Sequence, residues 1–250
     1  MAELNPHCCA NPAVTVDYKP KGSYTEFAGL NIYETAPNAS STCGIIAIND
    51  VFGMASQTLQ GADRMASAVN ARVIVPDFFD GHPLDMSLYP PDTEEKMKAA
   101  KAWREKHGDT DEGLSALLRV RKALDDKYPT IKSWGIYGLC WGGKVAIMAS
   151  GKDSAFAVSG TAHPGRIESD DADKLTIPHI CLFSQKDAEP EVVEKYRSAL
   201  KAKNNVEVDQ YSNMQHGWMG ARGFYNGEQS VKEFERGYDQ LAAFFSKYLK

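Results

Sequence analysis

The apolar positions of the chain fall into short runs that alternate with longer amphipathic stretches. The run Cys43–Asn49 has no polar alternation, which is typical of a strand buried on both faces. The segment Tyr24–Pro37 contains two short β-prone runs around Ala28-Gly29, as an antiparallel hairpin does. Further strands are predicted at Arg72–Asp77, Ile131–Tyr137, Ala155–Gly160, His179–Ser184 and Val206–Tyr211. Helices are predicted near Gln57–Asn70, Asp92–Lys106, Asp111–Lys127, Cys140–Ser150, Glu191–Lys203 and Gln229–Tyr248.

This regular alternation of strands and helices predicts an α/β fold with a mainly parallel central sheet flanked by helices. The length of 250 residues is sufficient for a single domain with a large core. Residues 1–22 are punctuated by proline and lack periodicity, so we expect an N-terminal arm that packs on a domain of residues 23–250. The charge runs near Glu94 and Asp170 are interpreted as solvated helix faces and loops.

Composition and charge narrow the class of protein. Apolar residues make up 43% of the chain and charged residues 24%, unlike a disordered or collagen-like protein. The formal net charge of −5 makes nucleic acid and anionic membranes unexpected partners. No apolar run approaches the length of a transmembrane helix, and the first residues do not resemble a signal peptide. The five cysteines show no CxxC spacing, which disfavours disulfides and a structural metal site. We therefore expect a cytoplasmic protein in a reducing compartment.

The stretch Trp134–Ser150 carries the clearest chemical signal, because a strand leads through glycines into a helix. Within it, Gly138-Leu139-Cys140-Trp141-Gly142 has the spacing of a sharp strand-to-helix turn that projects a nucleophile outward. In such a turn the amide of Trp141 points at a developing oxyanion. A thiol ionises at about pH 8.5, and a helix N-terminus lowers that value, so Cys140 is the candidate nucleophile for an ester carbonyl.

Two other interpretations of this stretch stay open. Cys140 is compatible with a small buried apolar residue beside a glycine-rich packing contact. Gly138 also begins a GxxxxGK spacing that ends at Lys144, as in a phosphate-binding loop. Val145 then stands where that motif has a serine or threonine for magnesium, which disfavours a nucleotide site.

A cysteine nucleophile needs a histidine base and an acid, which follow the nucleophile along the chain in α/β-hydrolases. Only His163 and His216 lie in predicted loops downstream of Cys140. His216 and Asp187 each follow a predicted strand, and parallel strands bring such loops to one edge of the sheet. The chain order Cys140, Asp187, His216 therefore predicts a catalytic triad.

Each of these residues also has an ordinary structural explanation. His216 is compatible with a loop histidine that bonds to backbone groups, and Asp187 with an acid at a helix N-terminus. Asp209 is a competing acid, although its place within a predicted strand disfavours it. His163 fits a pocket wall and an ordinary turn before Pro164 equally well.

The sequence resembles the dienelactone hydrolase family, a cysteine-nucleophile branch of the α/β-hydrolases, at Gly138–Gly142, Asp187 and His216-Gly217. The resemblance extends along nearly the whole chain and is closest to fungal members. Those members share three further features, which here are Cys8-Cys9, the Tyr-x-Pro-Lys-Gly segment Tyr18–Gly22, and a strand that ends in an acid before Phe-Gly, Asn49–Gly53.

The resemblance implies an α/β-hydrolase fold in which Val51 donates the second oxyanion amide beside Trp141. It also implies that Asp50, where bacterial members have glutamate, contacts the resting thiol. Bacterial members bind a substrate carboxylate with arginines, whereas here the loop after Asp77 has none and Arg222 is the remaining candidate. Aromatic side chains instead favour a larger apolar substrate. The pocket candidates are Phe52, Phe78, Phe79, His163, Trp218 and Arg222.

The sequence thus predicts a hydrolase, without cofactor or metal, of a small-molecule ester, lactone or thioester. His216 is expected to deprotonate Cys140 and then to activate water on the acyl-enzyme, while Asp187 orients the imidazole. Two alternatives stay open: an acyltransferase or lactone-forming enzyme of a biosynthetic pathway, and a non-catalytic binding protein on the same scaffold. We expect a monomer or homodimer with no nucleic-acid or membrane partner.

Overall fold

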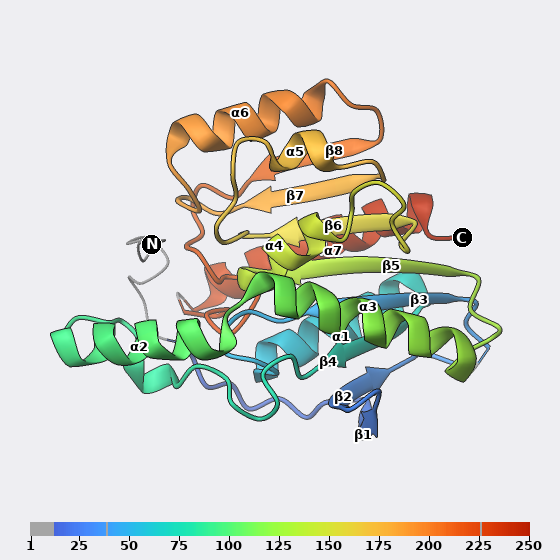
Figure 1. Ribbon diagram of the computed structural model, residues 1–250, viewed down its shortest axis with the longest axis horizontal. Helices are drawn as coiled ribbons and strands as arrows, with labels where there is room; N and C mark the ends of the chain where they lie inside the picture. Colours follow the sequence, from blue (N-terminus) through green and yellow to red (C-terminus); the bar gives the residue numbers. More distant parts are fainter. Residues whose placement is uncertain (1–12, 39, 226) are drawn as a thin grey trace.

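The computed structural model describes residues 13–38, 40–225 and 227–250. Within them, one eight-stranded sheet runs in the order β1-β2-β4-β3-β5-β6-β7-β8 (Figure 1). β1 (Ser23–Phe27) and β2 (Leu30–Thr35) form the predicted antiparallel hairpin, and β2 also pairs antiparallel with β4. The prediction of an α/β fold with a mainly parallel sheet is confirmed. The parallel strands are β3 (Cys43–Ile48), β4 (Arg72–Pro76), β5 (Ser133–Leu139), β6 (Val158–Ala162), β7 (His179–Phe183) and β8 (Val206–Gln210).

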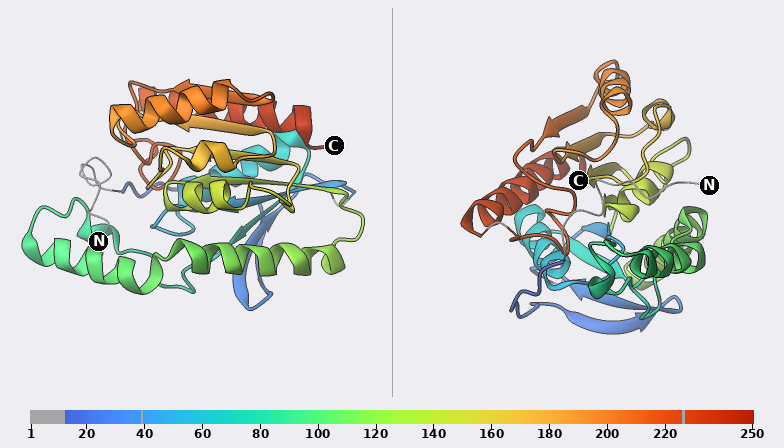
Figure 2. Two further views of the ribbon diagram at one scale, coloured as in Figure 1. Left: turned by 45° about the horizontal axis from the view of Figure 1, so that its top comes forward. Right: turned by 90° about the vertical axis from the view of Figure 1, so that its left-hand side faces the viewer.

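Helices cover both faces of this sheet (Figure 2). α1 (Ser56–Val69) and α7 (Glu228–Tyr248) lie side by side on one face. α2 (Glu94–His107) projects from the body at the left-hand end of Figure 1, the end toward which the parallel strands point. The short 3₁₀ turn Met86–Leu88 precedes it. The other face carries α3 (Thr110–Lys127), α4 (Trp141–Met148), α5 (Asp171–Lys174) and α6 (Pro190–Lys201).

The two faces of the sheet account for the unbroken apolar runs in the sequence. Ile45 packs in the core against α1 and α7, whereas its neighbour Ile46 packs in the core against α3 and α4. Successive side chains of a strand point to opposite faces, so a strand covered on both sides needs apolar residues at every position. β3 is therefore the buried central strand that its sequence predicts.

Tertiary pairing moves some predicted boundaries. β6 begins at Val158 rather than at Ala155, because Val158 is the residue that pairs with Gly135 of β5. β5 continues to Leu139, beyond the predicted end at Tyr137, because Leu139 still pairs with β6. α3 begins at Thr110, one residue before the predicted start, and the carboxylate of Asp109 caps it by accepting hydrogen bonds from the amides of Asp111 and Glu112.

Residues 13–22 of the predicted N-terminal arm pack on the domain. The amide of Val14 donates to the carbonyl oxygen of Ala221 at 2.9 Å. The hydroxyl of Tyr18 and the amide of Lys21 both donate to the buried carboxylate of Asp63. The N-terminal part of the arm, with Cys8-Cys9, lies outside the described residues.

The described cysteines, Cys43, Cys140 and Cys181, are free thiols. None of the helices in the described part of the chain is long and apolar enough to cross a membrane.

Candidate active site

The candidate residues lie in loops that follow four neighbouring parallel strands. Cys140 follows β5, His163 follows β6, Asp187 follows β7, and His216 follows β8. The register pairs the last residue of β5 with the last residue of β6, so Cys140 and His163 leave the sheet at the same level. This edge is the carboxyl end of the parallel strands, where ligands bind in open α/β sheets.

Cys140 occupies a strained turn between β5 and α4. Its backbone has φ 53° and ψ −112°, a conformation that residues other than glycine rarely adopt. A Cβ atom on Gly138 would lie 1.9 Å from the carbonyl oxygen of Gly142, and one on Gly142 would lie 2.5 Å from that of Ile48. Both glycines are needed for these close approaches, which explains the glycine on each side of the cysteine.

Neighbouring loops hold the backbone of Cys140 in place. Its amide donates to the carbonyl oxygen of Ala162 at 3.3 Å. Its own carbonyl oxygen accepts from the amides of Gly143 at 3.0 Å and Gly165 at 2.9 Å. A Cβ atom on Gly165 would lie 3.6 Å from Sγ of Cys140, so Gly165 lies directly beside the thiol.

His216 and Asp187 form a buried pair. Nδ1 of His216 lies 2.7 Å from Oδ1 of Asp187, and their side chains are 1% and 0% exposed. Ser184 at the end of β7 donates to the same carboxylate through both its amide and its hydroxyl. Asp187 therefore orients the imidazole, and the cap of α6 is Glu189 instead. The competing acid Asp209 accepts from the amide of its neighbour Gln210.

The residues expected to supply oxyanion amides follow two adjacent strands. Val51 follows β3 and Trp141 begins α4 after β5, and β3 and β5 pair as far as Ile48 and Gly138. The strand order across the sheet reverses here, since β4 and β5 lie on opposite sides of β3. Such a switch point leaves a crevice between the two connections.

Asp50 is buried at the end of β3 and bonds to the backbone. Its Oδ1 accepts from the amide of Phe52 at 2.9 Å, and its Oδ2 accepts from the amide of Ala221 at 3.0 Å. Burial raises the pKa of the Asp50 carboxyl, while these amides and the nearby Arg222 and His216 oppose that rise. Contact with the thiol stays a prediction of the resemblance.

Aromatic side chains surround the start of α4. The ring of the half-buried Phe78 lies 5.8 Å from that of Trp141, and the ring of Phe79 lies 4.9 Å from it. The Trp141 indole donates to the carbonyl oxygen of Gly108 at 3.0 Å. Of the predicted pocket residues, Phe78 and Phe79 thus lie beside the residue that follows Cys140.

Arg222 lies in a second aromatic group. Its guanidinium is centred 5.2 Å from the ring of Phe52 and 5.1 Å from the ring of Tyr89. It also donates to the carbonyl oxygen of His216 at 3.4 Å. Arg222 therefore contacts the backbone of the candidate base, and Phe52 packs against Arg222.

Trp218 lies outside this group, and its predicted place in the pocket wall stays a prediction. Its ring stacks on Tyr211 with centroids 4.3 Å apart, and it is 1% exposed in the core between the sheet and α7. A Cβ atom on Gly237 of α7 would lie 2.3 Å from the indole, so this tryptophan fills a space that the helix leaves open.

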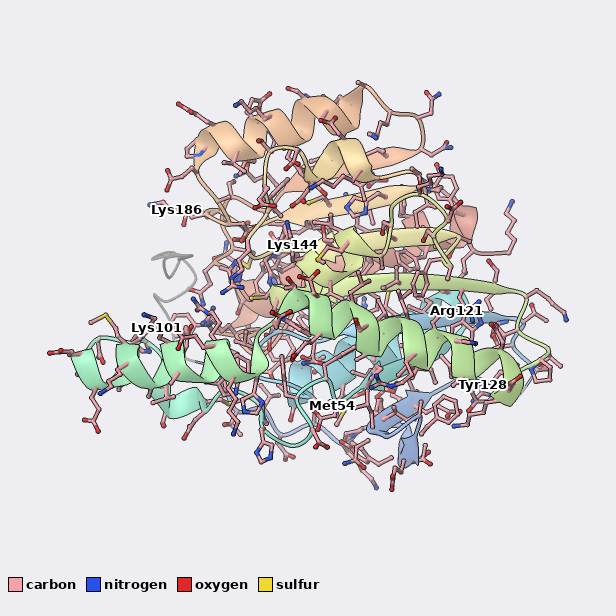
Figure 3. The ribbon with its side chains drawn as sticks, in the orientation of Figure 1. Met54, Lys101, Arg121, Tyr128, Lys144 and Lys186 are labelled. Atoms are coloured by element: carbon pink, nitrogen blue, oxygen red, sulfur yellow. The ribbon has the colours of Figure 1, made fainter. Side chains whose placement is uncertain are left out.

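Lys144 lies on α4 and points toward α5 (Figure 3). Its Nζ lies 2.7 Å from Asp171 and 3.0 Å from Glu168. Asp171 is 1% exposed, so the prediction that its charge run is solvated is wrong at this residue. These carboxylates, with that of Asp170, are the acidic set of the described residues that lies close enough to share a metal ion. Lys144 pairs with two of these carboxylates and Lys174 pairs with Asp170 and Asp171, so the lysine of the GxxxxGK spacing is held by acidic side chains.

Sequence reasoning missed three contributors to the site. Ser184 bonds to Asp187, Tyr89 packs on Arg222, and Ala221 donates to Asp50. The position of Ser184 at the end of a predicted strand, three residues before the acid, is a weak signal. Tyr89 and Ala221 carry none, because a backbone amide or an aromatic ring in a loop has no distinctive pattern.

The chain matches the model of the Dienelactone hydrolase family over residues 30–249. Over the full length of both chains it is 29% identical to an uncharacterized AIM2 family protein of Schizosaccharomyces pombe. It is 25% identical to Hydrolase pyvD of Aspergillus violaceofuscus, again over the whole of both chains. A carboxymethylenebutenolidase homolog of Homo sapiens is 24% identical over 82% of each chain.

Solved structures share the fold at lower identity. A putative dienelactone hydrolase from Klebsiella pneumoniae superposes with a TM-score of 0.66 at 20% identity, covering 88% of this chain and 93% of that one. A dienelactone hydrolase from Anabaena variabilis gives a TM-score of 0.64 at 12% identity, covering 93% and 99%.

Proposed function

The chain belongs to the dienelactone hydrolase family, and we propose that it hydrolyses an ester, lactone or thioester with Cys140 as nucleophile. The observation that carries this proposal is the buried 2.7 Å hydrogen bond between Asp187 and His216. It lies at the same edge of the sheet as the strained turn at Cys140. A general base held by a buried acid, and a nucleophile held in a strained turn, are the two parts that acyl transfer needs.

The proposed reaction has two halves. Because Nδ1 of His216 donates to Asp187, Nε2 is the nitrogen that accepts the proton of Cys140. Sγ adds to the carbonyl carbon, and the amides of Val51 and Trp141 stabilise the oxyanion. The tetrahedral intermediate then breaks its bond to the leaving alkoxide or thiolate, which takes the proton from His216. His216 next deprotonates water, which attacks the acyl-enzyme and releases the acid and the thiol.

The side chains around the site favour an apolar acyl group. Phe78, Phe79 and Trp141 form an aromatic group beside the nucleophile. The guanidinium of Arg222 packs against the rings of Phe52 and Tyr89 and donates to the carbonyl oxygen of His216, so these contacts compete with a substrate carboxylate. We therefore propose esters or lactones with a bulky apolar acyl part as substrates.

Hydrolysis by wild-type protein and by Cys140→Ala tests the proposal. The substrates are p-nitrophenyl esters of increasing acyl length, an aromatic lactone and an acyl thioester. We expect C140A to fall to the background rate on every substrate that the wild type cleaves, whereas Cys43→Ala keeps wild-type turnover. Hydrolysis by C140A at the wild-type rate would contradict the proposal. Products formed with an added alcohol distinguish hydrolysis from acyl transfer.

A further inference from the structure

The segment Ala162–Gly165, which begins at the last residue of β6, contacts both the candidate nucleophile and the candidate base. The carbonyl oxygen of Ala162 accepts a hydrogen bond from the amide of Cys140 at 3.3 Å, and the amide of Gly165 donates to the carbonyl oxygen of Cys140 at 2.9 Å. Both backbone polar groups of the cysteine are thus bound by one four-residue turn. The position of this turn therefore helps to fix the position of the thiol.

The second residue of the turn, His163, contacts His216. The two imidazole rings lie with centroids 5.1 Å apart and planes at 71°, which is an edge-to-face contact. His163 is 0% exposed, and its amide donates to the carbonyl oxygen of Leu182 at 2.8 Å. Its backbone has φ 39°, in the left-handed region, where strain persists only if the surrounding structure imposes it.

The turn is packed closely against α4. A Cβ atom on Gly143 would lie 3.1 Å from Cα of Pro164, so the first turn of α4 has room for the turn because it carries glycine there. Proline also limits the backbone of His163, the residue that precedes it. The backbone of His163 is therefore held in place, which fixes the position from which its ring contacts His216.

We propose that His163 is a positioning residue that sets the plane of the His216 imidazole relative to Cys140. The proposal rests on the proposed function and concerns the same site. The hydrogen bond to Asp187 holds one nitrogen of His216 but permits the ring to pivot about that bond. The edge-to-face contact with His163 removes this freedom and keeps the other nitrogen directed at the thiol. Because the same turn also holds the backbone of Cys140, it fixes the positions of nucleophile and base relative to each other.

Two substitutions separate the ring contact from the backbone conformation. His163→Asn removes the ring but retains a residue type that tolerates positive φ. His163→Phe retains a ring of similar size without its nitrogens. We expect H163N to lower kcat about 10-fold with KM little changed, because a misaligned His216 imidazole slows the chemical step rather than substrate binding. H163F is expected to keep kcat within about threefold of the wild type. Thermal unfolding of each variant verifies that it is folded.

A wild-type kcat in folded H163N would overturn the proposal. An equal loss in folded H163N and H163F would also overturn it, because a nitrogen of His163 rather than its ring contact would then be required. If H163F does not fold, the ratio of the kcat loss to the KM change in H163N decides, and a change confined to KM contradicts positioning. Failure of the proposed function looks different: C140A and His216→Gln would then keep their activity.

Discussion

The backbone amide of Ala221 donates a 3.0 Å hydrogen bond to the carboxylate of Asp50, although the two residues are 171 positions apart. The other oxygen of this carboxylate accepts from the amide of Phe52. A Cβ atom on Gly220 would lie 2.4 Å from Oδ2, so the segment after His216 approaches Asp50 as closely as glycine permits. Asp50 thus joins the turn that contains Val51 to the loop that contains the candidate base.

Asp50→Asn is expected to weaken both the fold and the catalytic site. An asparagine has one acceptor oxygen, so one of the two buried amides faces an NH₂ group and loses its partner. We expect the free energy of unfolding to fall by about 1–3 kcal/mol, the cost of an unsatisfied buried donor. Displacement of the two segments is expected to lower kcat/KM about 10-fold. Urea unfolding and ester hydrolysis measure the two effects.

Asp80→Asn is the matched control for D50N. Asp80 is exposed, and its φ of 49° is a conformation that asparagine tolerates. The substitution removes the same charge in a nearby loop without touching the buried contact, so stability and activity should be unchanged. If D50N unfolds like the wild type but alters the rate at which iodoacetamide alkylates Cys140, the joining role is wrong. The thiol-modulating role that the resemblance implies would then be favoured.

Substitution of Gly165 tests where the acyl group lies. A Cβ atom there makes ordinary contacts of 3.4–3.6 Å with Cys140, so Gly165→Ala is expected to be tolerated. The larger Gly165→Val extends beside Sγ, and we expect it to reduce kcat/KM for octanoyl esters at least about 10-fold more than for acetyl esters. Gly151→Val, after α4 and away from the thiol, is the control. An equal loss for both esters in G165V would show that Gly165 does not border the acyl group.

The burial of His179 is expected to make the free energy of unfolding depend on pH. Burial lowers the pKa of this histidine from about 6.5 to about 3, and its ring bonds to Ser159 and Tyr196. As the pH falls below about 6.5 the unfolded chain takes up a proton that the folded chain does not, so stability is lost until about pH 3. Between pH 7 and pH 5 the wild type should lose about 2 kcal/mol more unfolding free energy than His179→Gln. Urea unfolding at both pH values measures this difference, and equal losses would contradict the burial of a neutral imidazole.

The sequence was sufficient for the features that depend on local pattern. The unbroken apolar run of β3 and the glycines around Cys140 each carry a signal within a few residues, and each has the expected backbone structure. The triad of Cys140, Asp187 and His216 stays a prediction, but topology explains why their loops lie near one another, since loops that follow parallel strands meet at one edge of the sheet.

The remaining features depend on which elements pack together. Trp218 lies in the same loop as His216, yet it enters the core because Gly237 of α7 leaves space there. Asp171 belongs to a run of charges, yet it is buried because Lys144 reaches it from α4. The edge-to-face contact of His163 with His216 depends on the spacing of β6 and the β8 loop. None of these relationships has a sequence period or motif.

Trapping of a covalent intermediate tests the central claim most directly. Wild-type protein is mixed with a p-nitrophenyl ester, quenched in acid within the first turnover, and analysed by intact mass and peptide mapping. We predict a mass increase equal to the acyl group, located on the peptide that contains Cys140, with the same increase absent from C140A. Wild-type turnover without an acylated Cys140, or with the acyl group on another residue, would contradict the account.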